Sequence, residues 1–114
     1  MAMRTLPKQE WRSFFDRMSG PLLGKQAEVE VASLELGDQI VDEWVPMLGI
    51  TYDSQDDLVD VALDRANRLI RHPREITVDE APNGLASIAL IDDEGARHVV
   101  RLREPITLPP ATAM

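Results

Sequence analysis

The chain of 114 residues is long enough for one domain with a single modest core, and it contains no cysteine. The lack of cysteine excludes disulfides, thiolate nucleophiles and cysteine-based zinc or iron–sulfur sites. The net charge is −8, and residues 25–64 carry one Lys or Arg against eleven Asp and Glu, a net charge of −10. A surface of this sign repels phosphates, so we expect no binding of nucleic acid.

The first residues, MAMRTLPKQEW, contain no apolar run of the kind found in signal peptides. The sequence also lacks the stretch of about 18 apolar residues that would be needed to span a bilayer. We therefore expect a soluble, cytoplasmic protein that makes no contact with membranes.

Residues 6–19 predict a helix near the start of the chain. Four large apolar side chains recur at helical spacing and form one stripe: Trp11, Phe14, Phe15 and Met18. Thr5 is suited to cap the start of this helix, and Gly20 followed by Pro21 is expected to end it. We expect the stripe to pack on a sheet, because a membrane-surface helix needs a longer and more basic polar face.

The middle of the chain shows the period of two that is typical of β-strands. The apolar residues of segment 27–31 alternate with glutamates, whereas Leu34 and Leu36 take the opposite parity. This switch predicts a bulge or bend around Ala32–Ser33, within a strand that continues to a turn at Gly37–Asp38.

The segment DSQDDLVDVALDRANRLIRHP, residues 53–73, permits two readings. One is a helix that begins near Ser54, buries an apolar stripe and ends at Pro73. The other is a turn followed by strands, because Val59 and Val61 alternate with polar or small neighbours. Periodicity alone mildly favours the helix.

The clearest local signal is a hairpin with the sequence GLASIALIDDEGARHVVRLREP. A three-residue loop that ends on Gly95 in the left-handed conformation pairs Leu90 with His98. The same register extends to Ala86 opposite Leu102. One face of the hairpin then carries apolar side chains and the other carries arginines, so turn chemistry and apolar pattern agree.

Three runs carry a resemblance to a known family: GITYDSQDDLVDVAL, LIRHPREITVDE and DDEGARHVVRLREP. The chain resembles, over nearly its full length, an uncharacterised bacterial domain-of-unknown-function family of short acidic proteins. The resemblance implies a bacterial source and a mostly β fold with one N-terminal helix. It also favours strand–turn–strand for residues 53–73, and it implies no activity, so no catalytic residue is assigned.

A candidate acidic patch is formed by five aspartates: Asp53, Asp56, Asp57, Asp60 and Asp64. An EF-hand loop that begins at the first of them would need a glycine at its sixth position, where Leu58 stands. We therefore expect a solvated acidic turn and strand, and no metal site.

The two histidines, His72 and His98, have no neighbouring nucleophile in a recognisable motif. His72 precedes Pro73, which predicts an extended backbone at His72. The hairpin register places His98 on or near the apolar face, as a packed or rim residue.

A candidate interaction patch is formed by the basic cluster Arg68, Arg71, His72 and Arg74. These residues could neutralise the acidic middle of the same chain, since exposed Arg–Asp pairs are common. They could instead contact the acidic segment of another copy and so produce a homo-oligomer. Phosphate binding is a third reading, although no Gly-rich loop accompanies the arginines.

These patterns predict an α+β, mostly β fold in which an N-terminal helix packs on a bent antiparallel sheet of about five or six strands. The sheet could close as a small SH3-like or Sm-like barrel. We expect residues 1–108 to form one domain and residues 109–114 a disordered tail.

For function we expect a non-enzymatic protein-interaction or self-association module without a cofactor. The alternative is a small-ligand or metal-binding protein or enzyme that uses His72, His98 and the aspartate cluster.

Overall fold

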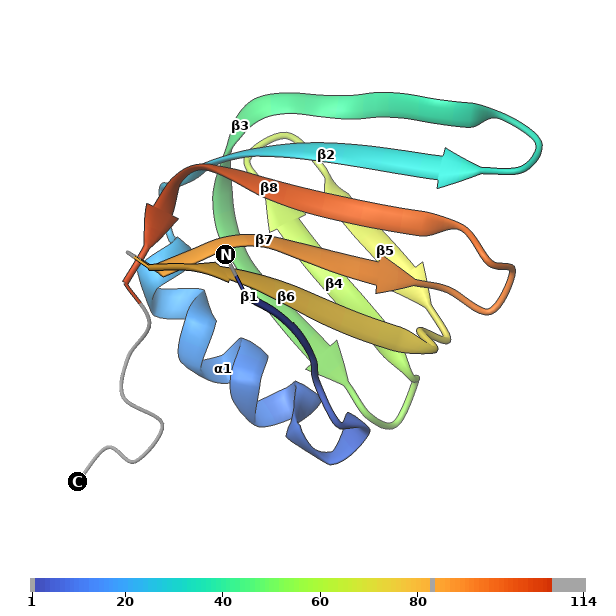
Figure 1. The fold of residues 1–114 in the computed structure, drawn as a ribbon, viewed down its shortest axis with the longest axis horizontal. Coiled ribbons are helices and arrows are strands. Elements are labelled where there is room, and N and C mark those ends of the chain that lie inside the picture. The colour runs from blue at the N-terminus through green and yellow to red at the C-terminus, as the bar shows by residue number, and fades with distance from the viewer. Residues whose placement is uncertain (1, 83, 108–114) are drawn as a thin grey trace.

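The computed structural model describes residues 2–82 and 84–107 (Figure 1). In chain order, its elements are the strand β1 (Ala2–Thr5), the short 3-10 helix η1 (Lys8–Glu10), the helix α1 (Trp11–Leu22), and the strands β2 (Gln26–Ser33), β3 (Gly37–Asp53), β4 (Leu58–Leu63), β5 (Asn67–Arg71), β6 (Glu75–Ala81), β7 (Gly84–Ile91) and β8 (Arg97–Ile106). The predicted tail of residues 109–114 lies outside the described residues.

The strands form one antiparallel sheet of eight, in the order β1-β6-β7-β8-β2-β3-β4-β5. Within the described residues, β1 and β5 are the two edges and do not pair with each other. The predicted mostly β fold with a helix on a bent antiparallel sheet is confirmed. The predicted five or six strands are too few, and a closed barrel is not confirmed.

The long strand β3, of 17 residues, bends the sheet. Its outer half, residues 37–46, pairs with β2, and its inner half, residues 47–53, pairs with β4. Regular pairing breaks between the halves, because Trp44 lies in the left-handed region with a φ of 51° and Pro46 has no amide hydrogen. The bend places β4 and β5 behind β6, β7 and β8 in Figure 1, so that buried side chains from both parts meet in one core.

The helix α1 packs against β3 and contributes the predicted stripe to the core. All four side chains of the stripe are buried: Trp11, Phe14, Phe15 and Met18. The predicted stop at Gly20 and Pro21 is wrong, since the helix continues to Leu22, whose complete burial offsets the hydrogen bond lost at Pro21. Thr5 does not cap this helix, because it belongs to β1. No helix in the described part of the chain is long and apolar enough to cross a membrane.

Ser19 attaches α1 to the backbone edge of the inner half of β3. Its hydroxyl donates to the carbonyl oxygen of Ile50 at 2.7 Å and accepts from the Ile50 amide at 3.3 Å. A neighbouring strand would ordinarily form these two bonds, but β2 pairs only with the outer half. The helix therefore covers an edge that would otherwise leave buried backbone groups unpaired.

The first hairpin turns earlier than predicted. The strand β2 ends at Ser33, residues 34–36 form the turn, and β3 begins at Gly37. The Ser33 hydroxyl accepts from the Leu36 amide at 3.0 Å and stabilises this turn. The bulge expected at Ala32–Ser33 and the turn expected at Gly37–Asp38 are both wrong, because the parity switch marks the turn itself.

The strand reading of residues 53–73, favoured by the family resemblance, is confirmed by β4 and β5. On β4, Val59 and Val61 are buried while Asp60 lies on the other face, half-buried. The alternation predicts the strand correctly, whereas the helical stripe in the same sequence is coincidental.

The C-terminal hairpin has the predicted register near its turn. Leu90 pairs with His98, and Gly95 has a φ of 85° as the loop requires. A register shift between Leu85 and Ser87 ends this agreement, so the pair expected between Ala86 and Leu102 is not formed.

Candidate functional site

The five aspartates of the predicted acidic patch are spread along β4 and its two turns. Asp53 ends β3, Asp56 and Asp57 lie in the following turn, Asp60 lies within β4, and Asp64 lies in the turn before β5. Asp53 Oδ1 accepts from the backbone amides of Gln55 and Asp56, which closes the first turn. Among the described residues, no group of three or more His, Asp or Glu could hold a metal ion.

Asp57 is the centre of a polar cluster at one end of the sheet. Tyr52 Oη donates to Asp57 Oδ1 at 2.7 Å, and His72 Nδ1 lies 3.4 Å from Asp57 Oδ2. Lys8 Nζ approaches the same carboxylate at 4.0 Å. The cluster thus joins the β3–β4 turn, the segment after β5 and the segment before α1.

His72 adopts an unusual backbone conformation within this cluster. Its φ is 51°, and that of Asp57 is 49°, so both lie in the left-handed region. The extended backbone predicted for His72 is therefore wrong. The amide of His72 donates to the carbonyl oxygen of Asp57 at 2.8 Å, and this contact holds the two turns together despite the strain.

The protonation states in the cluster fit a structural role. Burial, together with the hydrogen bond to Asp57 and the charges of Asp57 and Asp53, raises the pKa of Tyr52 from 10.0 to about 12. The hydrogen bond from Tyr52 and the neighbouring His72 and Lys8 lower the pKa of Asp57 despite its partial burial. The phenol thus remains a hydrogen-bond donor to an ionised carboxylate, which makes it a poor base or nucleophile near neutral pH.

The second histidine has an aspartate of its own. His98 Nε2 lies 2.9 Å from Asp92 Oδ2, and Asp92 Oδ1 accepts from the backbone amides of Glu94 and Ala96. Burial alone would raise the pKa of Asp92, but these hydrogen bonds lower it. Asp92 therefore stabilises the β7–β8 turn, and the structure does not bring His98 to the Asp57 cluster.

The predicted basic patch is divided between different surfaces and partners. Arg68 pairs with Asp42 and also donates to the carbonyl oxygen of Val41, both in the outer half of β3. Arg74 donates to a backbone carbonyl in the β7–β8 turn. Arg71 is exposed and, by the alternation of β5, lies on the face opposite Arg68.

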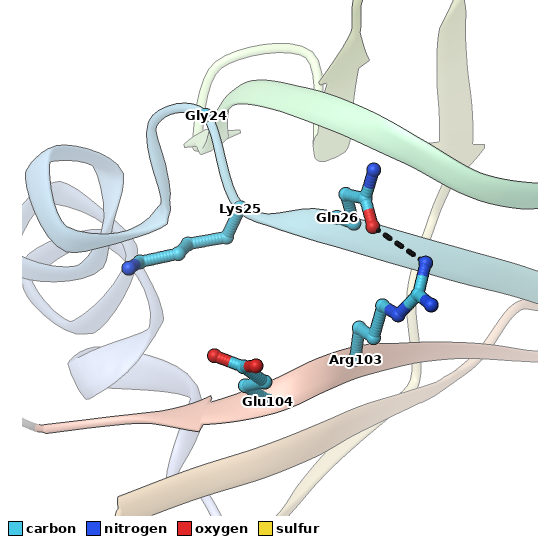
Figure 2. A pocket seen from close by; sticks show the side chains of 5 residues that line it. All are labelled: Gly24, Lys25, Gln26, Arg103 and Glu104. Carbon is cyan, nitrogen blue, oxygen red and sulfur yellow. Dashed lines mark hydrogen bonds between the residues drawn. The ribbon is translucent and has the colours of Figure 1, made fainter.

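An open depression of about 410 Å³ lies between the start of β2 and the end of β8 (Figure 2). Arg103 donates to the Gln26 side chain at 2.9 Å and lies over the Trp44 ring, while Lys25 and Glu104 extend together toward the α1 side. All residues that line it are exposed. A ligand here would remain largely in water, unlike ligands in most small-molecule sites.

The β2–β3 hairpin has a different character, because it exposes large apolar side chains. Leu34 is fully exposed, Leu36 is 69% exposed and Ile40 is 53% exposed. The hairpin turn lies at one end of the long dimension of the molecule (Figure 1). These three residues, with the hairpin backbone that carries them, are the candidate functional site.

A groove of about 400 Å³ adjoins this turn. The residues that line it come from the first hairpin (Val31, Ser33, Leu34, Glu35 and Leu36) and from the β7–β8 turn (Asp92, Glu94, Gly95 and Ala96). The groove therefore combines apolar side chains, mainly from the first hairpin, with carboxylates from both sides. A segment that binds here needs apolar contacts and tolerance of negative charge.

The outer half of β3 also has an unpaired backbone edge. On the side away from β2 no strand pairs with it in the described residues, because β4 pairs only with the inner half. Of the backbone groups on that edge, the Val41 carbonyl accepts from Arg68. Figure 1 shows β3 along the upper margin of the sheet with no strand above it.

Sequence patterns did not identify this site. The change of alternation at Leu34 and Leu36 was the available clue, because it marks a turn before Gly37, and leucines in a turn are expected to be exposed. The predicted strand continues through both leucines to Gly37–Asp38, so their position in an exposed turn was not predicted.

The comparisons with known proteins agree with the resemblance drawn from the sequence. Residues 2–111 match the "Family of unknown function (DUF5335)". An uncharacterised protein of Aquifex aeolicus (strain VF5) is 36% identical over 110 residues, which cover 96% of this chain and 99% of that relative. No solved structure matches the chain. The chain therefore belongs to the DUF5335 family of unknown function.

Proposed function

We propose that this chain is a non-catalytic interaction module that binds a partner protein through the β2–β3 hairpin. The observation that carries the proposal is the exposure of Leu34, Leu36 and Ile40 on one hairpin. Such side chains are usually buried, and several of them gathered on one exposed element are typical of a binding surface.

The polar clusters elsewhere support this assignment. Tyr52 and His72 are engaged with Asp57, His98 is engaged with Asp92, and Arg68 is engaged with Asp42. Each of these contacts links two segments of the fold, so each has a sufficient structural role. The exposed leucines have no such internal partner.

A different protein fits this surface better than a second copy of the chain. Residues 34–45 contain four Asp and Glu and no Lys or Arg, and the whole chain has a net charge of −8. Two such hairpins would repel each other, whereas a partner with basic side chains would be attracted.

The proposal is tested by comparing two double variants as baits in an extract of the source cells. One carries Leu34→Ser and Leu36→Ser, and the control carries Leu23→Ser and Leu48→Ser, two exposed leucines that lie directly after α1 and in the inner half of β3. We expect a protein captured by the wild type and the control to be lost with the hairpin variant. Once purified, that protein should bind the hairpin variant at least about tenfold more weakly than the control. Equal binding to both variants would contradict the proposal.

A further inference from the structure

We infer that the partner binds as an extended, lysine- or arginine-bearing segment that adds a strand to the free edge of the outer half of β3. This inference rests on the proposed function and specifies its chemistry. Strand addition to an exposed sheet edge is a recurring mode of peptide recognition, in which backbone hydrogen bonds supply affinity and alternate side chains supply specificity.

The backbone edge provides the first argument. The outer half of β3 is bonded to β2 on one side, and on the other side the Val41 carbonyl accepts a hydrogen bond from Arg68. That bond uses a side-chain donor, so it leaves the neighbouring amides of the edge without a strand. An added strand would pair with the edge between the turn and Arg68.

The charge of the edge indicates which kind of segment can bind to it. Asp42 is paired with Arg68, but no ion pair within the described residues includes Glu35, Asp38 or Glu43, all three of which are exposed. A strand that places a Lys or Arg beside Asp38 gains attraction, and an apolar residue beside Ile40 covers exposed hydrophobic surface. Because Asp38 and Ile40 share one face of the strand, the occupant is a segment that carries a basic and an apolar residue two positions apart.

The same charges disfavour a second copy of the chain on this edge. Two copies that met along this edge would bring together two segments that each carry Glu35, Asp38, Asp42 and Glu43 and no Lys or Arg. Like charges directly opposite each other destabilise a sheet, so acidic residues protect this edge from self-pairing while leaving it open to a basic strand.

The test uses the isotopically labelled full chain and three peptides of about eight residues, a typical strand length. The first repeats Lys-Thr-Val-Thr, so that lysine and valine share one face, and the second repeats Glu-Thr-Val-Thr. The third is the lysine peptide with alternate backbone nitrogens methylated. We expect the lysine peptide to shift the amide resonances of residues 34–45 and to slow amide exchange along the free edge. The other two peptides should bind at least about tenfold more weakly.

A charge-reversed variant, Asp38→Lys with Glu43→Lys, supplies the matched control. Both positions are exposed, so the fold should be retained, and the preference should reverse toward the glutamate peptide. Equal binding of the methylated and unmethylated lysine peptides would overturn strand addition while leaving the hairpin as a binding surface. Failure of all three peptides to bind would also overturn strand addition, and the bait comparison would still decide the proposed function. Concentration-dependent shifts in residues 34–45 without peptide would identify a second copy as the occupant and overturn the inference.

Discussion

The two halves of β3 belong to one continuous strand, yet their surroundings are opposite. In the inner half, Met47, Ile50 and Tyr52 are buried between α1 and the rest of the core. In the outer half no residue is fully buried, and Ile40 is largely exposed. The bend near Trp44 and Pro46 separates the halves, so the strand enters the core only after it has turned.

This difference shows that strand length here is not set by core packing alone. The inner half is fixed by side-chain burial and by Ser19, while the outer half is held by β2 and by Arg68. Val41 and Val45 pack against the core, whereas Ile40 and the turn residues Leu34 and Leu36 bury little apolar area and should add little to stability. This exposure is what the proposed binding role would explain.

The largest expected effect comes from making the same substitution in both halves. Ile50→Ala removes a side chain that is 1% exposed and should lower the free energy of unfolding by about 2–5 kcal/mol. Ile40→Ala removes one that is 53% exposed and should change it by less than about 0.5 kcal/mol. Urea denaturation of both variants checks this prediction, and similar losses would show that the outer half is part of the core.

A smaller effect is expected where α1 covers the inner half. Ser19→Ala leaves the Ile50 amide and carbonyl without their partner and should cost about 1–3 kcal/mol. Ser13→Ala, on the exposed side of the same helix, is the control and should change stability by less than about 0.5 kcal/mol. Thermal unfolding of the two variants measures the difference. A neutral Ser19→Ala would mean that water satisfies this edge.

We also predict that the folded chain loses stability in alkali, because Tyr52 lies in the inner half of β3. Tyr52 has a pKa of about 12 in the folded chain against 10.0 ordinarily, so its contribution is complete below pH 10 and declines as the pH rises through 12. Because Tyr52 is the sole tyrosine, phenolate absorbance reports on it alone. The titration midpoint should fall to near 10 in urea, and Tyr52→Phe should remove this part of the alkaline loss. A folded midpoint near 10 would contradict the account.

The smallest effect concerns the link between the outer half and β5. A double-mutant cycle with Arg68→Met and Asp42→Asn should give a coupling energy of about 0.2–1 kcal/mol, because Arg68 is partly exposed and solvent weakens the pair. The same cycle with Arg71→Met should give no measurable coupling, since Arg71 lies on the other face of β5. Equal coupling in both cycles would indicate a diffuse charge effect instead of a specific pair.

The parts of the fold that follow from local rules could be predicted from the sequence. The aromatic stripe of α1 and the turn ending on Gly95 each combine a spacing with a matching residue type. Residues 53–73 show the limit of periodicity, because the same apolar residues fit a helix and a strand. What decides for strands is pairing with β3, which is a contact distant in sequence.

The candidate site could not be predicted, because it consists of apolar side chains that are left exposed and not of residues in a recognisable motif. In sequence, Leu34, Leu36 and Ile40 resemble core residues, and only the three-dimensional structure shows that no described part of the chain covers them. The aspartates and arginines were predicted as candidate patches, but most of them make internal contacts across the fold. The missed signal was an apolar turn beside a glycine.

Residue-resolved amide hydrogen exchange along β3 tests the central claim most directly. We predict that the amides of residues 47–53 are protected to near the global free energy of unfolding. Amides on the free edge of residues 38–43 should exchange roughly a hundredfold faster or more, because only local opening is needed. Uniform protection along all of β3 in the isolated chain would contradict the account, since it would mean that the outer edge is already covered.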